Sequence, residues 1–250
     1  MTNPVQARSF DAEAAAYAAN RPSYPPALFD AVEELSGRPL AGARVADVGA
    51  GTGLGTARLR ERGAQITAVE PGDGMAEQFR RSLPDVPVVR GDGNRLPLRT
   101  GSMDLITYAQ AWHWTDPARS VPEVRRVLRP GGALALWWND SDPRVEWIAD
   151  QDRRLRAFFG AEVPTVYDDR ARFRAMLPDA LDFRTRLVTW SRRVPVDTHL
   201  ANIATYSDFL IADPAAVRDC LAREHAVLTA LFPSGEVEET YVVSLAVARP

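Results

Sequence analysis

Short apolar runs alternate with amphipathic stretches over the first 140 residues of the chain. The apolar runs predict strands, and the stretches between them, bounded by proline or glycine, predict helices. The expected strands are Ala43–Val48, Ala64–Glu70, Val86–Arg90, Met103–Ala109 and Ala133–Trp138. The expected helices are Pro26–Leu35, Thr56–Arg62, Gly74–Arg81 and Ala118–Leu128. This alternation is typical of βαβ units, so we expect a parallel sheet with helices on both faces.

The pattern changes after residue 140. Helical periodicity covers Pro143–Gly160, Asp168–Leu177 and Asp197–Leu231, whereas Phe183–Val194 and Thr240–Ala248 are typical of strands. We expect the two late strands to pair as a hairpin and to complete a mostly parallel, doubly wound, seven-stranded α/β sheet. The late helical stretches would then form a cap over the carboxyl ends of the strands, where ligands bind in such sheets.

The expected domain organisation is a single domain over residues 1–250. Its ligand-binding core covers about 38–139, and its helical cap combines segments of about 1–30, 140–178 and 197–232.

Charge and composition exclude several classes of protein. The chain has 30 basic residues, all of them arginine, against 33 acidic residues, so its formal charge of −3 lacks the basic footprint of a nucleic-acid binder. No apolar run reaches the roughly 18 residues of a membrane span, and the first residues lack a signal sequence. We therefore expect a cytoplasmic protein with no membrane partner. The single cysteine, Cys220, forms no internal disulfide and suits a buried apolar position, and no metal-ligand spacing surrounds it.

A glycine-rich turn follows the first predicted strand. It comprises Asp47, Gly49, Ala50, Gly51 and Gly53 in the run Asp-Val-Gly-Ala-Gly-Thr-Gly. Glycines at such a turn adopt positive φ and let a ligand approach the backbone closely. The spacing departs from the dinucleotide fingerprint G-x-G-x-x-G, because Leu54 or Thr56 stands at the third glycine position. Asp47 would also repel a pyrophosphate, whereas its carboxylate suits a ligand with a cationic amine.

This turn resembles the cofactor loop of class I S-adenosylmethionine-dependent methyltransferases, which have a Rossmann-like fold. The resemblance covers about Phe10 to Asn139 and implies S-adenosylmethionine as the cofactor. It implies that Glu70 accepts hydrogen bonds from the ribose hydroxyls. It also places Asp92 and the backbone of Gly93 at the adenine, although the family often has alanine at the position of Gly93. Further implied cofactor contacts are Pro71, Met75, Ala109, Gln110 and Trp112.

A second, narrower resemblance concerns the side of the methyl acceptor. Phe10, Tyr17, Arg21, Pro22, Tyr24 and Pro25, together with Gln110-Ala111-Trp112-His113-Trp114, resemble the small-molecule branch that includes trans-aconitate methyltransferase-like proteins. In that branch the N-terminal helix covers the cofactor. The resemblance therefore implies that Tyr17 and Arg21 lie near the methionine carboxylate, with Arg21 as a charge-assisted donor. The alternative is that Arg21 only orders the Arg-Pro turn.

Aromatic residues gather after the fourth predicted strand, where the transferred methyl group is expected. Aromatic walls exclude water and attract a sulfonium by cation–π contact. His113 is the candidate catalytic residue, as a general base, unless it is a structural imidazole. Other aromatic residues either line the pocket or fill the core of the cap: Trp137, Trp138, Trp147, Tyr167 and Tyr206.

The sequence therefore predicts in-line methyl transfer to a small organic molecule, for which we consider a carboxylic acid or a natural-product intermediate. One alternative is a protein that binds S-adenosylmethionine without transferring its methyl group. A nicotinamide-dependent oxidoreductase is opposed by the failed fingerprint. A nucleic-acid methyltransferase is opposed by low basicity and by Ala109-Gln110-Ala111-Trp112, which replaces the Asn/Asp-Pro-Pro-aromatic run of base-amine enzymes. The sequence leaves the oligomeric state open.

Overall fold

The computed structural model describes residues 14–160 and 173–250, and its strands form a single sheet. The strands are β1 (Arg44–Val48), β2 (Gln65–Glu70), β3 (Val88–Arg90), β4 (Met103–Ala109), β5 (Leu128–Ser141), β6 (Phe183–Pro195) and β7 (Glu236–Ala248). Their order in this seven-stranded sheet is β3-β2-β1-β4-β5-β7-β6, and β7 is antiparallel to both of its neighbours. The predicted doubly wound, mostly parallel sheet and its late hairpin are confirmed.

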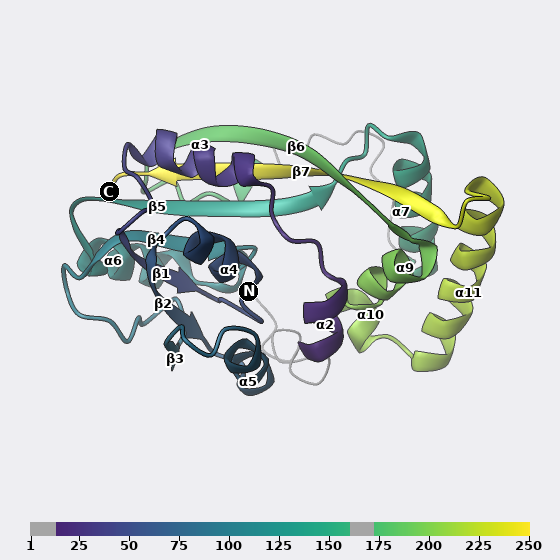
Figure 1. Ribbon diagram of the computed structural model, residues 1–250, viewed down its shortest axis with the longest axis horizontal. Coiled ribbons are helices and arrows are strands. Elements are labelled where there is room, and N and C mark those ends of the chain that lie inside the picture. Colours follow the sequence, from purple (N-terminus) through teal and green to yellow (C-terminus); the bar gives the residue numbers. More distant parts are fainter. Residues whose placement is uncertain (1–13, 161–172) are drawn as a thin grey trace.

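Helices cover both faces of the sheet (Figure 1). They are α2 (Ala14–Asn20), α3 (Pro26–Ser36), α4 (Leu54–Glu61), α5 (Asp73–Ser82), the 3-10 helix η1 (Trp112–Trp114), α6 (Pro117–Val127), α7 (Glu146–Phe158), α9 (Val196–Ala204), α10 (Ser207–Ile211) and α11 (Pro214–Leu231). One apolar cluster joins α3, α4 and α5 to one face, and a second joins α6 to the other. Alternating positions of β5 supply both clusters, Trp137 to the first and Trp138 to the second. A central strand that is buried on both faces reads as a continuous apolar run for this reason.

Several predicted boundaries differ from those of the structure. β5 begins at Leu128 instead of Ala133. The run Arg129-Pro130-Gly131-Gly132 is an irregularity inside the strand and not a turn before it. The pairing with β4 shows this, because Met103 pairs with Leu128 whereas Leu105 already pairs with Ala133. The helical stretch 197–231 is three helices. The last of them begins where the Asp213 side chain accepts a hydrogen bond from the Ala216 N–H, with Pro214 at the first helical position.

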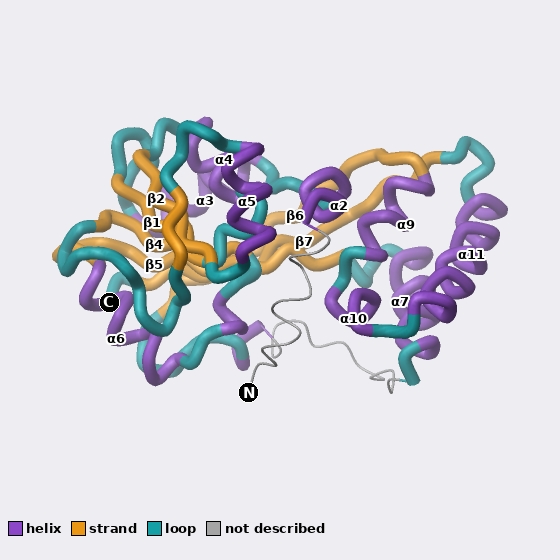
Figure 2. Tube along the Cα trace, turned by 90° about the horizontal axis from the view of Figure 1, so that it is seen from below, coloured by secondary structure: helices purple, strands orange, loops and turns teal. Residues whose placement is uncertain are grey.

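The last two strands extend beyond the core and carry a helical cap at their far end (Figure 2). Its helices α7, α9, α10 and α11 enclose a separate apolar cluster: Val196, Leu200, Ile203, Phe209, Cys220, Leu228 and Val237. Cys220 is buried as expected, and burial raises the pKa of its thiol. Helix α2 lies between the two parts, since it contacts α5 of the core and α9 of the cap. Phe10 and Tyr167 lie outside the described residues.

A buried network of charges fastens the cap to β7. Glu239 is 2% exposed and accepts hydrogen bonds from Arg192 of β6 and from His199 Nδ1 of α9, the latter at 2.7 Å. His199 Nε2 lies 2.9 Å from the carbonyl oxygen of Gln151, whose amide nitrogen donates to Glu224. Both ring nitrogens of His199 therefore lie within hydrogen-bond distance of a side-chain oxygen. Burial by itself raises the pKa of Glu239, but the bonds from His199 and Arg192 outweigh burial and hold that pKa below its ordinary value of 4.5.

The substitution Glu239→Gln is expected to lower the free energy of unfolding by roughly 3 kcal/mol at pH 7, because it removes the buried carboxylate to which Arg192 and His199 are hydrogen-bonded. A carboxyl with a depressed pKa in the folded state contributes stability above its unfolded pKa and loses it as the pH falls through the folded value. The difference between wild type and variant should therefore shrink below about pH 4. Urea unfolding at several pH values measures both effects. Glu238→Gln, at the more exposed neighbouring position, is the control and should change stability by less than about 0.5 kcal/mol.

Candidate active site

The glycine turn after β1 combines one crowded glycine with one open glycine. Gly49 and Gly51 have φ angles of 67° and 57°, in the left-handed region that disfavours side chains. A Cβ on Gly49 would lie 2.5 Å from the Cβ of Ala111, so packing at this point requires glycine. At Gly51 no atom of the described residues lies within 4 Å of that position. Ala50 and Gly53 complete the turn, and Gly53 is the N-cap of α4.

Glu70 ties this turn to the loop after β2. Its side chain is 6% exposed, Oε2 accepts a hydrogen bond from the Gly51 N–H at 2.8 Å, and Oε1 accepts one from the Gly72 N–H at 2.7 Å. Pro71 stands between these two anchoring points. These two hydrogen bonds orient the Glu70 carboxylate between the glycine turn and the loop after β2.

Asp47 lies beneath the glycine turn and is fully buried. Its oxygens accept hydrogen bonds from the hydroxyls of Thr56 on α4, at 2.6 Å, and Thr107 on β4, at 2.8 Å. Burial raises the pKa of Asp47 to about 6, although both hydroxyl bonds act in the opposite direction. The structure therefore places a carboxyl group that titrates close to neutral pH directly under the turn.

The residues expected at the adenine follow β2 and β3. Met75 is buried in the first turn of α5, and Asp92 is exposed, with Oδ1 accepting the Asn94 N–H at 2.7 Å. A Cβ on Gly93 would lie 2.8 Å from Thr115 Cγ2 and 2.9 Å from the Tyr108 hydroxyl. This crowding accounts for glycine at a position where the family often has alanine.

The substitution Gly93→Ala is expected to cost roughly 1–3 kcal/mol of stability through overpacking. The double substitution Tyr108→Phe/Thr115→Ser removes the two crowding atoms, and it should reduce the cost of Gly93→Ala measured in that background. Chemical unfolding of the four proteins forms the thermodynamic cycle. Equal costs in both backgrounds would contradict the steric explanation.

The chain leaves β4 through a strained residue. Gln110 has a φ of 54° and is the one non-glycine residue with positive φ in the described ranges. Its N–H donates to the carbonyl of Trp137 at 2.8 Å, and its side chain interacts with the hydroxyl of Tyr24. Such backbone strain is concentrated at functional sites, and here it directs the chain after Ala109 across the end of the sheet.

The aromatic run after β4 has a buried residue next to an exposed one. Trp112 packs edge-on against Tyr108, with 4.9 Å between ring centroids, whereas His113 is exposed. His113 Nδ1 accepts a hydrogen bond from Trp138 Nε1 at 3.1 Å. This hydrogen bond holds the His113 ring at the end of the sheet. The role of His113 as a general base stays a prediction.

Arg21 bridges α2 and the cap. Its guanidinium carbon lies 4.8 Å from the ring centroid of Tyr17 and 4.5 Å from that of Tyr206, and one terminal nitrogen donates to the carbonyl of Thr205 at 3.2 Å. Arg21 therefore does more than order the Arg-Pro turn. Among the other aromatic candidates, Trp137 packs in the core and Trp147 in the cap.

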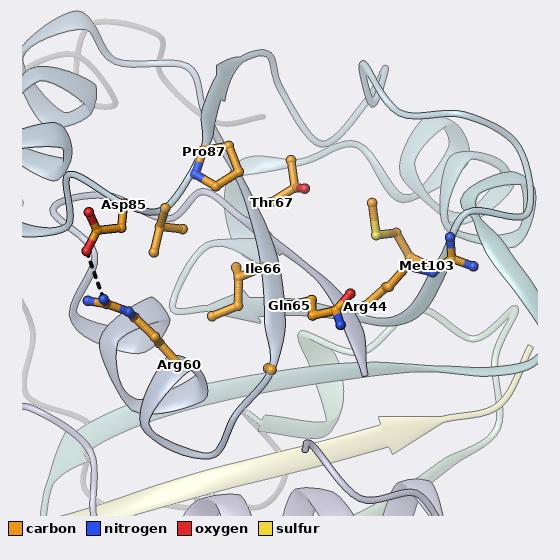
Figure 3. Close-up of a pocket in the computed structure, with 10 residues that line it drawn as sticks. Arg44, Arg60, Gln65, Ile66, Thr67, Asp85, Pro87 and Met103 are labelled. Carbon is orange, nitrogen blue, oxygen red and sulfur yellow. Dashed lines mark hydrogen bonds and ion pairs between the residues drawn. The ribbon is translucent and has the colours of Figure 1, made fainter. Parts of the chain in front are cut away.

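A separate hollow opens at the opposite edge of the sheet, where the amino ends of the strands lie (Figure 3). Its volume is about 390 Å³, and its lining includes Arg44, Gln65 and Met103. Arg60 and Asp85 form an ion pair at 2.9 Å on its rim. None of the sequence-predicted site residues lines this hollow, so it lies outside the candidate site.

The described residues contain no group of metal-ligating side chains. Within the same ranges, no helix combines the length and apolarity that a membrane crossing requires.

Comparison with known proteins identifies the family. Residues 46–136 match the model of a methyltransferase domain. An uncharacterized methyltransferase of Mycobacterium tuberculosis is 40% identical over 211 residues, which cover 84% of this chain and 81% of the relative. A demethylmenaquinone methyltransferase of Beutenbergia cavernae is 31% identical over 153 residues, covering 61% of this chain and 60% of the relative. A solved structure described as a type II methyltransferase from Anaeromyxobacter dehalogenans is 27% identical, covers 92% of this chain and 97% of its own, and has a TM-score of 0.72.

The turn, the sheet order and these similarities agree: the chain belongs to the class I S-adenosylmethionine-dependent methyltransferases.

Proposed function

We propose that this enzyme transfers the methyl group of S-adenosylmethionine to a small organic molecule. The observation that best supports this proposal is the position of Arg21. Its guanidinium lies between the rings of Tyr17 on α2 and Tyr206 at the start of α10. This bridge joins α2, which contacts α5 of the core, to the cap. A site covered by α2 and the cap would admit a compact acceptor, unlike a folded protein or a nucleic-acid duplex.

The cofactor site fits S-adenosylmethionine in three features. The open face of Gly51 leaves room for a ligand against the backbone, and the Glu70 carboxylate lies beside it, where we assign it to the ribose hydroxyls. Asp47 supplies negative charge beneath the turn for the cationic amine. We assign Met75, Asp92 and the backbone of Gly93 to the adenine, and Pro71, Gly49, Ala50 and Gly53 to the walls of the cradle.

When bound, the cofactor supplies a methyl group activated by a sulfonium. The chain contributes position and exclusion of water, since orientation of two reactants supplies roughly 7–11 kcal/mol of a barrier. Ala109, Gln110 and Trp112 form the wall nearest to the expected methyl group. His113, whose ring is oriented by Trp138, is the candidate general base for an acceptor that must lose a proton.

The similarity to a demethylmenaquinone methyltransferase supports an organic acceptor over a protein or nucleic acid, because that relative is named for demethylmenaquinone. The acidic balance of the chain, with a formal charge of −3, supports it as well. No feature of the described residues favours binding without transfer over catalysis.

The proposal is tested by incubating the enzyme with S-adenosylmethionine and one of two cell fractions. One fraction holds metabolites below roughly 1 kDa, and the other holds the macromolecules above that cutoff. S-adenosylhomocysteine should accumulate with the small molecules. Glu70→Ala should weaken S-adenosylhomocysteine binding roughly 30- to 150-fold, since it removes hydrogen bonds to a charged acceptor. Glu77→Ala, at an exposed position on α5, is the matched control. Methylation confined to the macromolecules would contradict the proposed acceptor, and unchanged binding by Glu70→Ala would contradict the assignment of the ribose.

Cofactor affinity should depend on the ionisation of Asp47. Because the pKa of the free enzyme's Asp47 is about 6 and the bound amine favours the carboxylate, affinity for S-adenosylhomocysteine is expected to fall as the pH drops below about 6, by at most about tenfold per pH unit. Asp47→Asn should bind more weakly at pH 7.5 and lose this pH dependence. Calorimetric titration from pH 5 to 8 (a window of roughly this width brackets the transition) measures it.

The same substitution should stabilise the free protein. A carboxyl whose pKa rises from 3.8 to about 6 on folding costs the folded state stability as the pH rises through that window, up to roughly 3 kcal/mol. Asp47→Asn should therefore unfold at a higher urea concentration than wild type above pH 6, whereas lower stability there would show that the carboxylate is needed by the fold.

A further inference from the structure

A buried tyrosine stands in the segment that joins α2 to α3. Tyr24 is 7% exposed, and its ring packs edge-on against Trp137 of β5, with 5.8 Å between the ring centroids. Trp137 pairs with Ala109, which is the last residue of β4. Tyr24 therefore lies beside the point at which the chain leaves β4 and enters the wall of the candidate site.

Contacts on both sides hold the backbone of this segment. Ser23 Oγ accepts a hydrogen bond from Arg58 Nε of α4 at 2.8 Å, and Pro25 is the N-cap of α3. A proline ring restricts its own φ and disfavours the helical conformation of the residue before it, which here is Tyr24. The segment is therefore fixed to two helices that pack on the sheet, and Tyr24 extends from a restrained backbone.

The Tyr24 hydroxyl interacts with the side-chain amide of Gln110. Gln110 is thereby held at two points, because its N–H also donates to the carbonyl of Trp137 at 2.8 Å. Its φ of 54° is unfavourable for a residue that has a side chain, since the Cβ then comes close to the following carbonyl oxygen. Such a conformation persists only where neighbouring groups hold it. Tyr24 supplies one of the two restraints.

The conformation of Gln110 bears directly on the glycine turn. The next residue, Ala111, packs so closely against that turn that a Cβ on Gly49 would lie 2.5 Å from the Cβ of Ala111. The φ and ψ angles of Gln110 set the direction in which the chain passes from β4 to Ala111. Because protein interiors are close-packed, a change in these angles would move Ala111 against Gly49 and disturb the turn.

We propose that Tyr24 is a positioning residue for cofactor binding: its hydroxyl holds Gln110 in the left-handed conformation, and Gln110 in turn seats Ala111 against the glycine turn. Tyr24 acts through Gln110 and touches no substrate. The inference rests on the proposed function, since it takes the glycine turn and Gln110 as parts of the cofactor site. The competing explanation is that Tyr24 only fills the core next to Trp137, and the experiment must separate the two roles.

The first variant is Tyr24→Phe, which keeps the ring against Trp137 and removes the hydroxyl. It should weaken the binding of S-adenosylhomocysteine roughly 3- to 10-fold, which is the usual effect of losing one neutral hydrogen bond. Calorimetric titration measures the affinity, and urea unfolding shows that the variant is folded. An affinity equal to that of wild type would overturn the proposal.

Substitutions of Gln110 test whether the hydroxyl acts through the backbone of that residue. Gln110→Ala removes the amide that Tyr24 holds but keeps the unfavourable φ, whereas Gln110→Gly also removes the strain, because glycine adopts positive φ readily. Gln110→Ala should therefore bind S-adenosylhomocysteine more weakly than Gln110→Gly. Adding Tyr24→Phe to Gln110→Gly should change the affinity by less than about twofold, because the hydroxyl then has no side chain to hold.

Two results of this comparison would count against the inference. Equal affinities of Gln110→Ala and Gln110→Gly would show that backbone strain has no part in binding. An undiminished effect of Tyr24→Phe in the Gln110→Gly background would show that the hydroxyl acts by another route.

Phe29 supplies the matched control for packing. Its ring also meets Trp137 edge-on, with 6.1 Å between centroids, but it carries no hydroxyl. Phe29→Leu should lower the urea concentration at the unfolding midpoint and leave the affinity for S-adenosylhomocysteine unchanged. If it weakens binding as much as Tyr24→Phe does, the effect of Tyr24 is one of core packing, and the inference fails while the proposed function stands. If the wild-type protein binds no S-adenosylhomocysteine at all, the proposed function itself fails.

Discussion

The pairing of β7 between β5 and β6 is the constraint on which the remaining architecture depends. These strands have 14, 13 and 13 residues, whereas β1 has five. At about 3.3 Å per residue they are long enough to cross the core and continue beyond it. The continuation holds the cap against the carboxyl ends of the shorter strands, where βαβ geometry already places the ligand site. One hydrogen-bonded ladder therefore sets both the end of the core and the enclosure of the site.

Buried charge is handled differently in the two parts of the protein. In the cap, hydrogen bonds from His199 and Arg192 outweigh burial and lower the pKa of Glu239. In the core, Asp47 meets only hydroxyls and burial raises its pKa. The first arrangement stabilises the folded chain by itself. The second has a cost for the free protein that a cationic ligand would offset, which is the electrostatic signature of a binding site.

The sequence predicted the core of the fold well because local patterns determine it. A few neighbouring residues are enough to predict the strands β1 to β4 and the glycine turn after β1. β7 was predicted to begin at Thr240, because the preceding run Glu236–Glu239 is charged, yet Glu239 is buried by partners on β6 and α9. Such pairing depends on distant residues, and no local pattern shows it.

The candidate site likewise contains residues that local motifs predict and contacts between distant segments that they do not. Glu70 and the turn were predicted from their place after β1 and β2, and the structure brings them into direct contact. The contacts of Arg21 with the cap were missed, because they join residues such as Arg21 and Thr205 that are 184 positions apart. The hydrogen bond between His113 and Trp138 likewise joins two different segments, and no local pattern shows it.

The attachment of the cap through paired strands has a mechanical consequence. A cap on a single flexible linker rotates about a hinge, but this one is borne by a β-ribbon whose backbone hydrogen bonds run unbroken from Phe183 opposite Ala248 to Pro195 opposite Glu236. Any displacement of the cap must twist or bend that ribbon, so it is elastic and returns to the same geometry. The bending and twisting stiffness of this ribbon therefore limits how far the cap can move relative to the core.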